Sequence, residues 1–199
     1  TPAEWIPLPD AVSDDDGVFL PNMETAVGVV QDLRPVFGET VLVAGLGVVG
    51  LLVVELLSRC GAERVIACDP IERRRKLAEQ AGCVALGPAH DAVERITALT
   101  NGRGPDRAVN VSGTAEGLQL AIDTVAREGT VVEASWYGSR AATLALGTRF
   151  HRRRLTVRSS QVSHINPSLS PRWTKPRRLE TALRLLGEVE PSRFITHRF

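Results

Sequence analysis

The chain has 199 residues, of which 43% are hydrophobic and 24% charged, and its formal net charge at pH 7 is +1. This length accommodates one large domain or two small ones, and the composition excludes a disordered or fibrous chain. The longest apolar run, residues 41–54, is too short to span a membrane and is interrupted by glycine, so we expect no membrane-spanning segment.

Short apolar runs alternate with amphipathic segments along the chain. Strands are predicted at residues 40–45, 64–69, 83–87, 107–113, 130–136 and 155–161. Helices are predicted at residues 48–61, 70–82, 91–102, 115–129 and 177–188, with Pro70 at the first position of the second helix and a proline-rich loop at residues 165–176. This order predicts an α/β fold with three layers, a doubly wound parallel sheet of the Rossmann type.

The first strand and helix enclose the sequence GLGVVG, which places glycines at positions 45, 47 and 50. In a nucleotide-binding turn, Gly45 permits the tight bend, Gly47 lets the backbone approach a pyrophosphate, and Gly50 lets the helix pack closely on the strand. The helix N-terminus then offers free N–H groups to the phosphates. The alternative is a glycine-rich turn in a hydrophobic core without a ligand.

Asp69 ends the second predicted strand, about 20 residues beyond the motif, where a carboxylate accepts hydrogen bonds from the adenosine ribose. A carboxylate there repels a 2′-phosphate, so we expect NAD in preference to NADP. Arg74 is placed to contact the same ribose, although the basic run 73–75 leaves room for a 2′-phosphate. The alternative for Asp69 is a helix cap at the end of the strand.

Cysteine content and charge distribution bound the remaining possibilities. The three cysteines form no C-x-x-C pair and the N-terminus does not have the pattern of a signal peptide, so we expect reduced thiols in a cytoplasmic protein. Residues 1–39 contain eight acids and one base, whereas residues 134–179 contain ten bases and no acid. We favour a solvated face, or a face that docks the acidic segment, over nucleic-acid binding.

Four stretches resemble the nucleotide-binding portion of the medium-chain dehydrogenase/reductase superfamily, the relatives of zinc alcohol, sorbitol and threonine dehydrogenases. They are VFGETVLVAGLGVVGLLVVELLSRCGAERVIACDPIERRRKLAEQAGC, TNGRGPDRAVNVSG, LQLAIDTVAREGTVVEASWYGS and LLGEVEPSRFITHRF. The resemblance covers most of the chain from about residue 20 onward. It implies an oxidoreductase in which hydride passes between nicotinamide and an alcohol, polyol, aldehyde or ketone, with the protein orienting the cofactor.

The resemblance also implies which residues surround the cofactor. Around the pyrophosphate it places Gly45, Leu46, Gly47, Val48 and Val49, and around the adenosine ribose Asp69 and Arg74. Next to the ribose and the bridge it places Ser112 and Gly113. Beside the nicotinamide it places Thr25, Ala134, Ser135, Trp136, Ser159, Ser160 and Gln161.

The superfamily's catalytic domain, roughly 150 residues that precede the nucleotide-binding domain, is absent from this sequence. We therefore expect part of a larger protein, inactive alone and without an identifiable catalytic residue. Residues 1–37 would be a remnant of the catalytic domain with a linking helix, 38–162 the NAD-binding domain, and 163–199 a loop and helix that return to the missing domain.

The same resemblance argues against zinc binding by this chain. The position of the third zinc ligand in zinc-dependent relatives falls near Pro21, which cannot bind the metal. Glu24, three positions further on, could substitute only if the loop differs. We expect no metal ligand set in this chain.

Two expectations concern assembly and an alternative function. Relatives dimerise through the last strand of the sheet, here residues 155–161, where Arg158 would mark an edge, so a homodimer that acts on a small-molecule substrate is expected. The alternative is a non-catalytic nucleotide sensor or assembly subunit whose basic face docks a partner.

Overall fold

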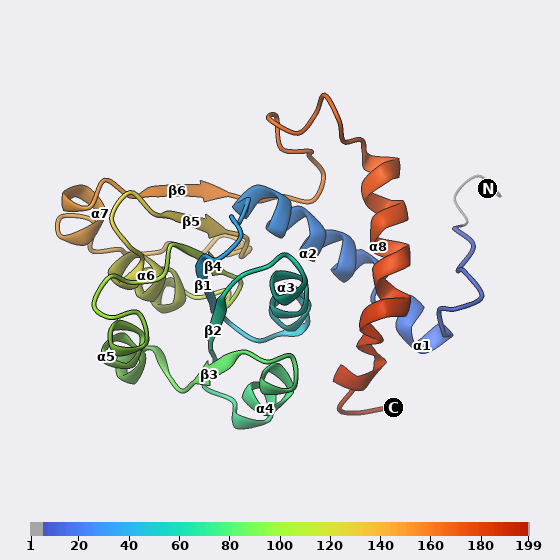
Figure 1. The fold of residues 1–199 in the computed structure, drawn as a ribbon, viewed down its shortest axis with the longest axis horizontal. Helices are drawn as coiled ribbons and strands as arrows, with labels where there is room; N and C mark the ends of the chain where they lie inside the picture. Colours follow the sequence, from blue (N-terminus) through green and yellow to red (C-terminus); the bar gives the residue numbers. More distant parts are fainter. Residues whose placement is uncertain (1–5, 199) are drawn as a thin grey trace.

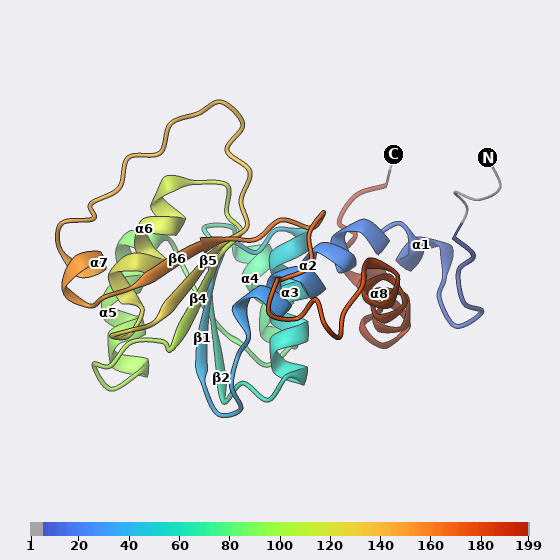
Figure 2. The ribbon, with the colours of Figure 1, turned by 90° about the horizontal axis from the view of Figure 1, so that it is seen from above.

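Figures 1 and 2 show the computed structural model, which describes residues 6–198 except for the side chains at positions 89 and 90. Residues 1–5, which belong to the predicted segment 1–37, and residue 199 lie outside the described residues. Of the helices in the described part, none combines the length and the apolar character needed to cross a membrane.

Six parallel strands form the central sheet. They are β1 (Thr40–Ala44), β2 (Arg64–Cys68), β3 (Val84–Leu86), β4 (Arg107–Asn110), β5 (Thr130–Glu133) and β6 (Thr156–Ser159). Their order is β3-β2-β1-β4-β5-β6, so β3 and β6 are the edges and the winding reverses between β1 and β4. The doubly wound sheet predicted from the sequence is confirmed, and the reversal defines the switch point at which such sheets bind ligands.

Helices cover both faces of the sheet, as Figure 2 shows. One face carries α2 (Leu20–Leu33), α3 (Val48–Arg59) and α4 (Glu72–Gln80), and the other carries α5 (Ala89–Leu99), α6 (Ala115–Thr124) and the short α7 (Arg149–Arg152). Alternate residues of β1 serve the two layers, because Val41 and Val43 pack with α2 and α3 whereas Leu42 packs with α5 and α6. β1 is therefore buried along its whole length.

The C-terminal helix α8 (Lys175–Val189) lies along the outer side of α2 (Figure 1). Its apolar residues Ala182 and Leu186 belong to the same core cluster as Met23 of α2 and Val41 of the sheet. The short helices α1 (Asp14–Gly17) and η2 (Pro191–Phe194) contact each other. The two predicted flanking segments thus share one core with the central sheet, although the division into domains stays a prediction.

Several predicted helix ends are wrong by a few residues. The helix predicted from Pro70 begins at Glu72, and the helix predicted to residue 129 ends at Thr124, because Val125 turns to an extended ψ of 145°. The last helix begins at Lys175, within the predicted proline-rich loop, because the side chain of Thr174 caps it and proline is tolerated in a first turn. Helix α7 was not predicted.

Arg178 of α8 is a buried cation, with 1% of its surface exposed. Its Nε and Nη2 donate to Oε1 of Glu24 on α2 at 3.1 and 2.9 Å, and Nη1 donates to the carbonyl oxygen of His164 at 2.9 Å. Nη2 also donates to the carbonyl oxygen of Val162. One guanidinium therefore joins α2, α8 and the loop after β6.

Two bases of the basic block are paired with acids of α2. Arg178 is buried against Glu24, and Arg158 of β6 lies 3.5 Å from a carboxylate oxygen of Asp32. Both acids belong to the acidic segment 1–39, so two of the ten bases of the block contact that segment. This arrangement does not favour the alternative of a basic face that docks a partner.

The Glu24–Arg178 pair should contribute measurably to stability. Glu24→Ala leaves a buried guanidinium without its carboxylate, and we expect the free energy of unfolding to fall by about 2–3 kcal/mol, toward the lower end of the range because Glu24 is partly exposed. Urea unfolding would measure the change.

The control is Glu188→Ala, which breaks an exposed ion pair with Arg184 on the same helix and should cost less than about 1 kcal/mol. Equal losses for Glu24→Ala and Glu188→Ala would contradict the assignment of Arg178 as a buried anchor.

Candidate functional site

The turn after β1 packs backbone against backbone. Gly45 has a φ of +98°, and a Cβ there would lie 2.6 Å from the Cα of Ser112 in the loop after β4. A Cβ at Gly50, in the first turn of α3, would lie 2.0 Å from the carbonyl oxygen of Gly45. Neither position has room for a side chain, so glycine is needed at both for the turn, α3 and the β4 loop to meet.

Gly47, the residue before α3, has a different environment. A Cβ at this position would meet nothing within 4 Å, and no side chain of the described residues caps the helix. The N–H groups of the first turn, including those of Val48 and Val49, therefore have no capping acceptor. Open space beside the bare N-terminus of a long helix is an environment that suits a phosphate group.

Asp69 connects the motif turn to the second strand. Its Oδ2 accepts a hydrogen bond from the N–H of Leu46 at 2.8 Å, and its Oδ1 accepts one from the N–H of Ile71 at 2.8 Å. The Nη1 of Arg74 lies 3.5 Å from Oδ2. The bond to Ile71 shows that Asp69 also stabilises the turn before α4. This is close to the alternative role considered for Asp69, a helix cap at the end of the strand. Each oxygen keeps a further lone pair for a ligand.

A cavity of about 240 Å³ opens beside Asp69, at the carboxyl ends of the strands. Four predicted site residues line it, namely Gly45, Asp69, Arg74 and Ser112. The glycine turn and the aspartate thus meet next to the switch point of the sheet, where doubly wound folds hold their ligands.

Five of the predicted residues, Ser112 among them, lie in the loops after β4 and β5. The N–H of Gly113 donates to Oγ of Ser135 at 3.0 Å, which joins the two loops. Ala134 packs against the core, whereas the indole of Trp136 is 89% exposed. Of the five, Ser112 alone lines the cavity beside Asp69 within the described part of the chain.

The remaining four predicted residues lie apart from that cavity. Oγ of Ser160 donates to Oδ2 of Asp32 at 2.6 Å, near the end of α2. Ser159 and Gln161 line a separate cavity of about 150 Å³ together with Asp32. The hydroxyl of Thr25 donates to a carbonyl oxygen of its own helix at 2.8 Å. The structure does not bring these four residues to Asp69, and their contact with a nicotinamide stays a prediction.

Two polar residues at strand ends were not predicted as part of the site. Asn110, the last residue of β4, is fully buried, and its Nδ2 donates to Oε2 of Glu133, the last residue of β5, at 2.7 Å. A signal was present in the sequence, because each residue ends an otherwise apolar run and a buried amide requires a partner.

The described residues do not fit a zinc ion. Within residues 6–198, apart from side chains 89 and 90, no three His, Cys, Asp or Glu side chains form a group that could hold a metal. Glu24 is engaged by Arg178, so it is not a free ligand in place of Pro21. Burial raises the pKa of Cys68 to about 12, which favours a neutral thiol over the thiolate that zinc binds. No step of the chemistry proposed for this chain passes through a metal.

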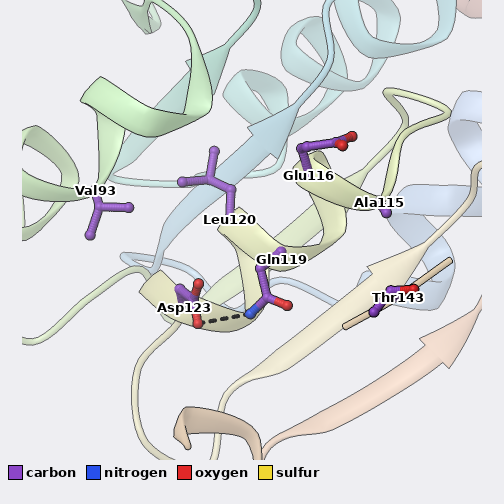
Figure 3. A pocket seen from close by; sticks show the side chains of 7 residues that line it. All are labelled: Val93, Ala115, Glu116, Gln119, Leu120, Asp123 and Thr143. Atoms are coloured by element: carbon purple, nitrogen blue, oxygen red, sulfur yellow. Dashed lines mark hydrogen bonds between the residues drawn. The ribbon is translucent and has the colours of Figure 1, made fainter. Parts of the chain in front are cut away.

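A third cavity, of about 380 Å³, lies over α6. Figure 3 shows Val93 of α5 facing Leu120, and the amide of Gln119 bonded to Asp123 at 2.9 Å. Glu116 and Leu120 line both this cavity and the one beside Asp69, so the two adjoin. Its lining includes none of the predicted site residues.

Comparison with known proteins identifies the family of the chain. Residues 48–185 match the profile of a family described as zinc-binding dehydrogenase. D-guloside 3-dehydrogenase of Escherichia coli K12 is 32% identical over 182 residues, which are 90% of this chain and 52% of that protein. (R,R)-butanediol dehydrogenase of Bacillus subtilis 168 is 33% identical over 133 residues, 65% of this chain and 38% of that protein.

A similar solved structure is alcohol dehydrogenase TADH from Thermus sp. ATN1. Its TM-score is 0.78 at 26% sequence identity, and the match covers 96% of this chain and 54% of that one. The chain thus spans about half the length of the proteins that it resembles.

The two glycines that flank the start of α3 should respond differently to alanine. Gly50→Ala forces a methyl group against the carbonyl of Gly45, and we expect a loss of about 2 kcal/mol and a melting temperature lower by roughly 5 °C. Gly47→Ala has open space and a φ of −65°, so its melting temperature should stay within about 2 °C of the wild type. Calorimetry of the two variants tests this, and the reverse order would be inconsistent with the turn described.

Proposed function

The chain belongs to the zinc-binding dehydrogenase family, and we propose that it is the NAD-binding half of a larger oxidoreductase that acts on an alcohol, polyol or aldehyde. The observation that carries this proposal is the meeting of the glycine turn with Asp69, whose carboxylate lies 2.8 Å from the N–H of Leu46. A bare helix N-terminus after the glycine turn and a carboxylate bonded to that turn suit a dinucleotide, which presents phosphate and ribose hydroxyls together.

In this proposal, each part of the site has a distinct task. The first-turn N–H groups of α3, at Val48 and Val49, hold the pyrophosphate over the open space at Gly47. Asp69 accepts hydrogen bonds from the ribose, and the loops after β4 and β5 orient the nicotinamide. When bound, the nicotinamide supplies the hydride donor or acceptor. Substrate binding and proton transfer belong to the remainder of the larger protein.

The charge of Asp69 favours NAD over NADP. Its side chain is 3% exposed, so a 2′-phosphate beside it would face a carboxylate poorly screened by water. Arg74, 3.5 Å away and 45% exposed, offsets part of this charge. We therefore propose a preference for NAD rather than exclusion of NADP. Cytoplasmic location and a homodimer through β6 stay predictions.

The first test is a titration of the chain with NADH, in which calorimetry and the fluorescence of the nicotinamide measure binding. We expect saturable binding to the wild type and its loss in Gly47→Val, because a branched side chain fills the open space at position 47. An absence of NADH binding to a folded wild-type chain would overturn the proposed function.

The second test concerns the choice of cofactor. Asp69→Ala removes the ribose acceptor, and we expect NADH affinity to fall at least about tenfold, with NADPH affinity falling less or rising. The ratio of the two affinities is the measurement, because Asp69 also supports the turn and its loss loosens both complexes. Glu116→Ala, which removes a carboxylate from another wall of the cavity, should leave the ratio unchanged. Equal weakening of NADH and NADPH by Asp69→Ala would remove the ribose assignment.

A further inference from the structure

The ends of β4 and β5 are joined by a pair of polar side chains beneath the loops that follow them. Asn110 is fully buried, and its Nδ2 donates to Oε2 of Glu133 at 2.7 Å. Residues 110 and 133 are also opposite each other in the parallel pairing of β4 and β5. A buried amide and a half-buried carboxylate that bond each other in this way fix the relative position of the two strand ends.

Each partner also holds the loop that follows its own strand. Oδ1 of Asn110 accepts from the N–H of Ser112 at 3.2 Å and from its Oγ at 2.7 Å. Oε1 of Glu133 accepts from the N–H of Ser135 at 2.7 Å. Since Gly113 donates to Oγ of Ser135, the network closes between the two loops. Both loops carry residues to which the proposed function assigns cofactor contacts.

Tyr137 adds a third connection. Its hydroxyl lies 3.1 Å from Oε2 of Glu133, from the carbonyl oxygen of Thr114 and from Nδ2 of Asn110. Burial and the nearby Glu133 carboxylate raise the pKa of Tyr137 to about 12. The hydroxyl therefore keeps its proton at neutral pH, so it donates to one of the oxygens and accepts from the amide.

We propose that Asn110 and Glu133 are positioning residues that align the two cofactor-binding loops, an inference that rests on the proposed function. They act through Ser112, Gly113 and Ser135. The division of roles between amide and carboxylate matters, because Glu133 supplies two acceptor oxygens whereas Asn110 supplies a donating NH2 group and one acceptor oxygen. A matched pair of amides or of carboxylates would leave a donor facing a donor or an acceptor facing an acceptor.

The test exchanges the two groups. Glu133→Gln places an amide opposite an amide, and Asn110→Asp places a carboxylate opposite a carboxylate. The double variant reverses the pair, since the carboxylate at position 110 still has an oxygen for Ser112 and the amide carbonyl at position 133 still accepts from Ser135. We expect each single variant to weaken NADH binding at least about tenfold, and the double variant to recover to within about threefold of the wild type.

Adenosine 5′-monophosphate separates alignment from general loosening. Under the proposed function it occupies the ribose side at Asp69 and lacks the nicotinamide that the two loops orient, so each single variant should weaken NADH more than AMP. A merely structural role predicts parallel losses. Gln119→Glu is the matched control, because it makes the same change from amide to carboxylate opposite Asp123 (Figure 3) and should leave the NADH-to-AMP ratio unchanged.

The outcomes distinguish the two proposals. If the folded wild type does not bind NADH, the proposed function fails and the positioning role fails with it. The positioning role alone fails in three cases in which the wild type does bind NADH. In the first, the single variants bind NADH as tightly as the wild type. In the others, they lose NADH and AMP affinity in parallel, or the double variant does not restore NADH affinity. If a single variant does not fold, Tyr137→Phe provides the comparison, because it removes only the hydroxyl. It should weaken NADH about threefold more than AMP, and an unchanged ratio would overturn the proposal.

Discussion

The close approach of three backbone segments at the carboxyl end of β1 is the constraint from which the site follows. The turn at Gly45, the first turn of α3 at Gly50 and the loop at Ser112 meet with no room for a side chain at either glycine. This contact directs the N-terminus of α3 toward the switch point and brings the N–H of Leu46 within reach of Asp69. The cavity beside Asp69 exists because these segments are held this near to each other.

The sequence predicted those parts of the molecule that depend on local pattern. The six strands and the glycine spacing are read from neighbouring residues, and Asp69 follows from a fixed distance along the chain. Contacts between residues far apart in the chain could not be predicted from the sequence. Arg178 lies 154 positions from Glu24, and nothing near either residue in the sequence signals the other. The end of α6 was misplaced because residues 126–128 favour a helix, whereas the backbone at Val125 leaves it.

The described residues supply the proposed cofactor site more completely than they supply a metal site. The glycine turn, the carboxylate of Asp69 and the loops after β4 and β5 are all present and packed onto one sheet. A ligand set for zinc is not found among the described residues, since Pro21 has no donor atom and Glu24 is bonded to Arg178. The recognition proposed for the cofactor therefore relies on backbone N–H groups and one carboxylate, and it requires no metal from this chain.

The anchoring of α8 by Arg178 has a consequence for sequence variation. The guanidinium of Arg178 is buried and bonded to Glu24, Val162 and His164, so it does not tolerate the loss of the Glu24 carboxylate alone. Loss of the guanidinium would in turn leave the carboxylate of Glu24 without its hydrogen-bond donor. Positions 24 and 178 should therefore change together among homologues, either as a charged pair or as two apolar residues of similar combined volume. Covariation at these two sites would then record the link between the first and last thirds of the chain.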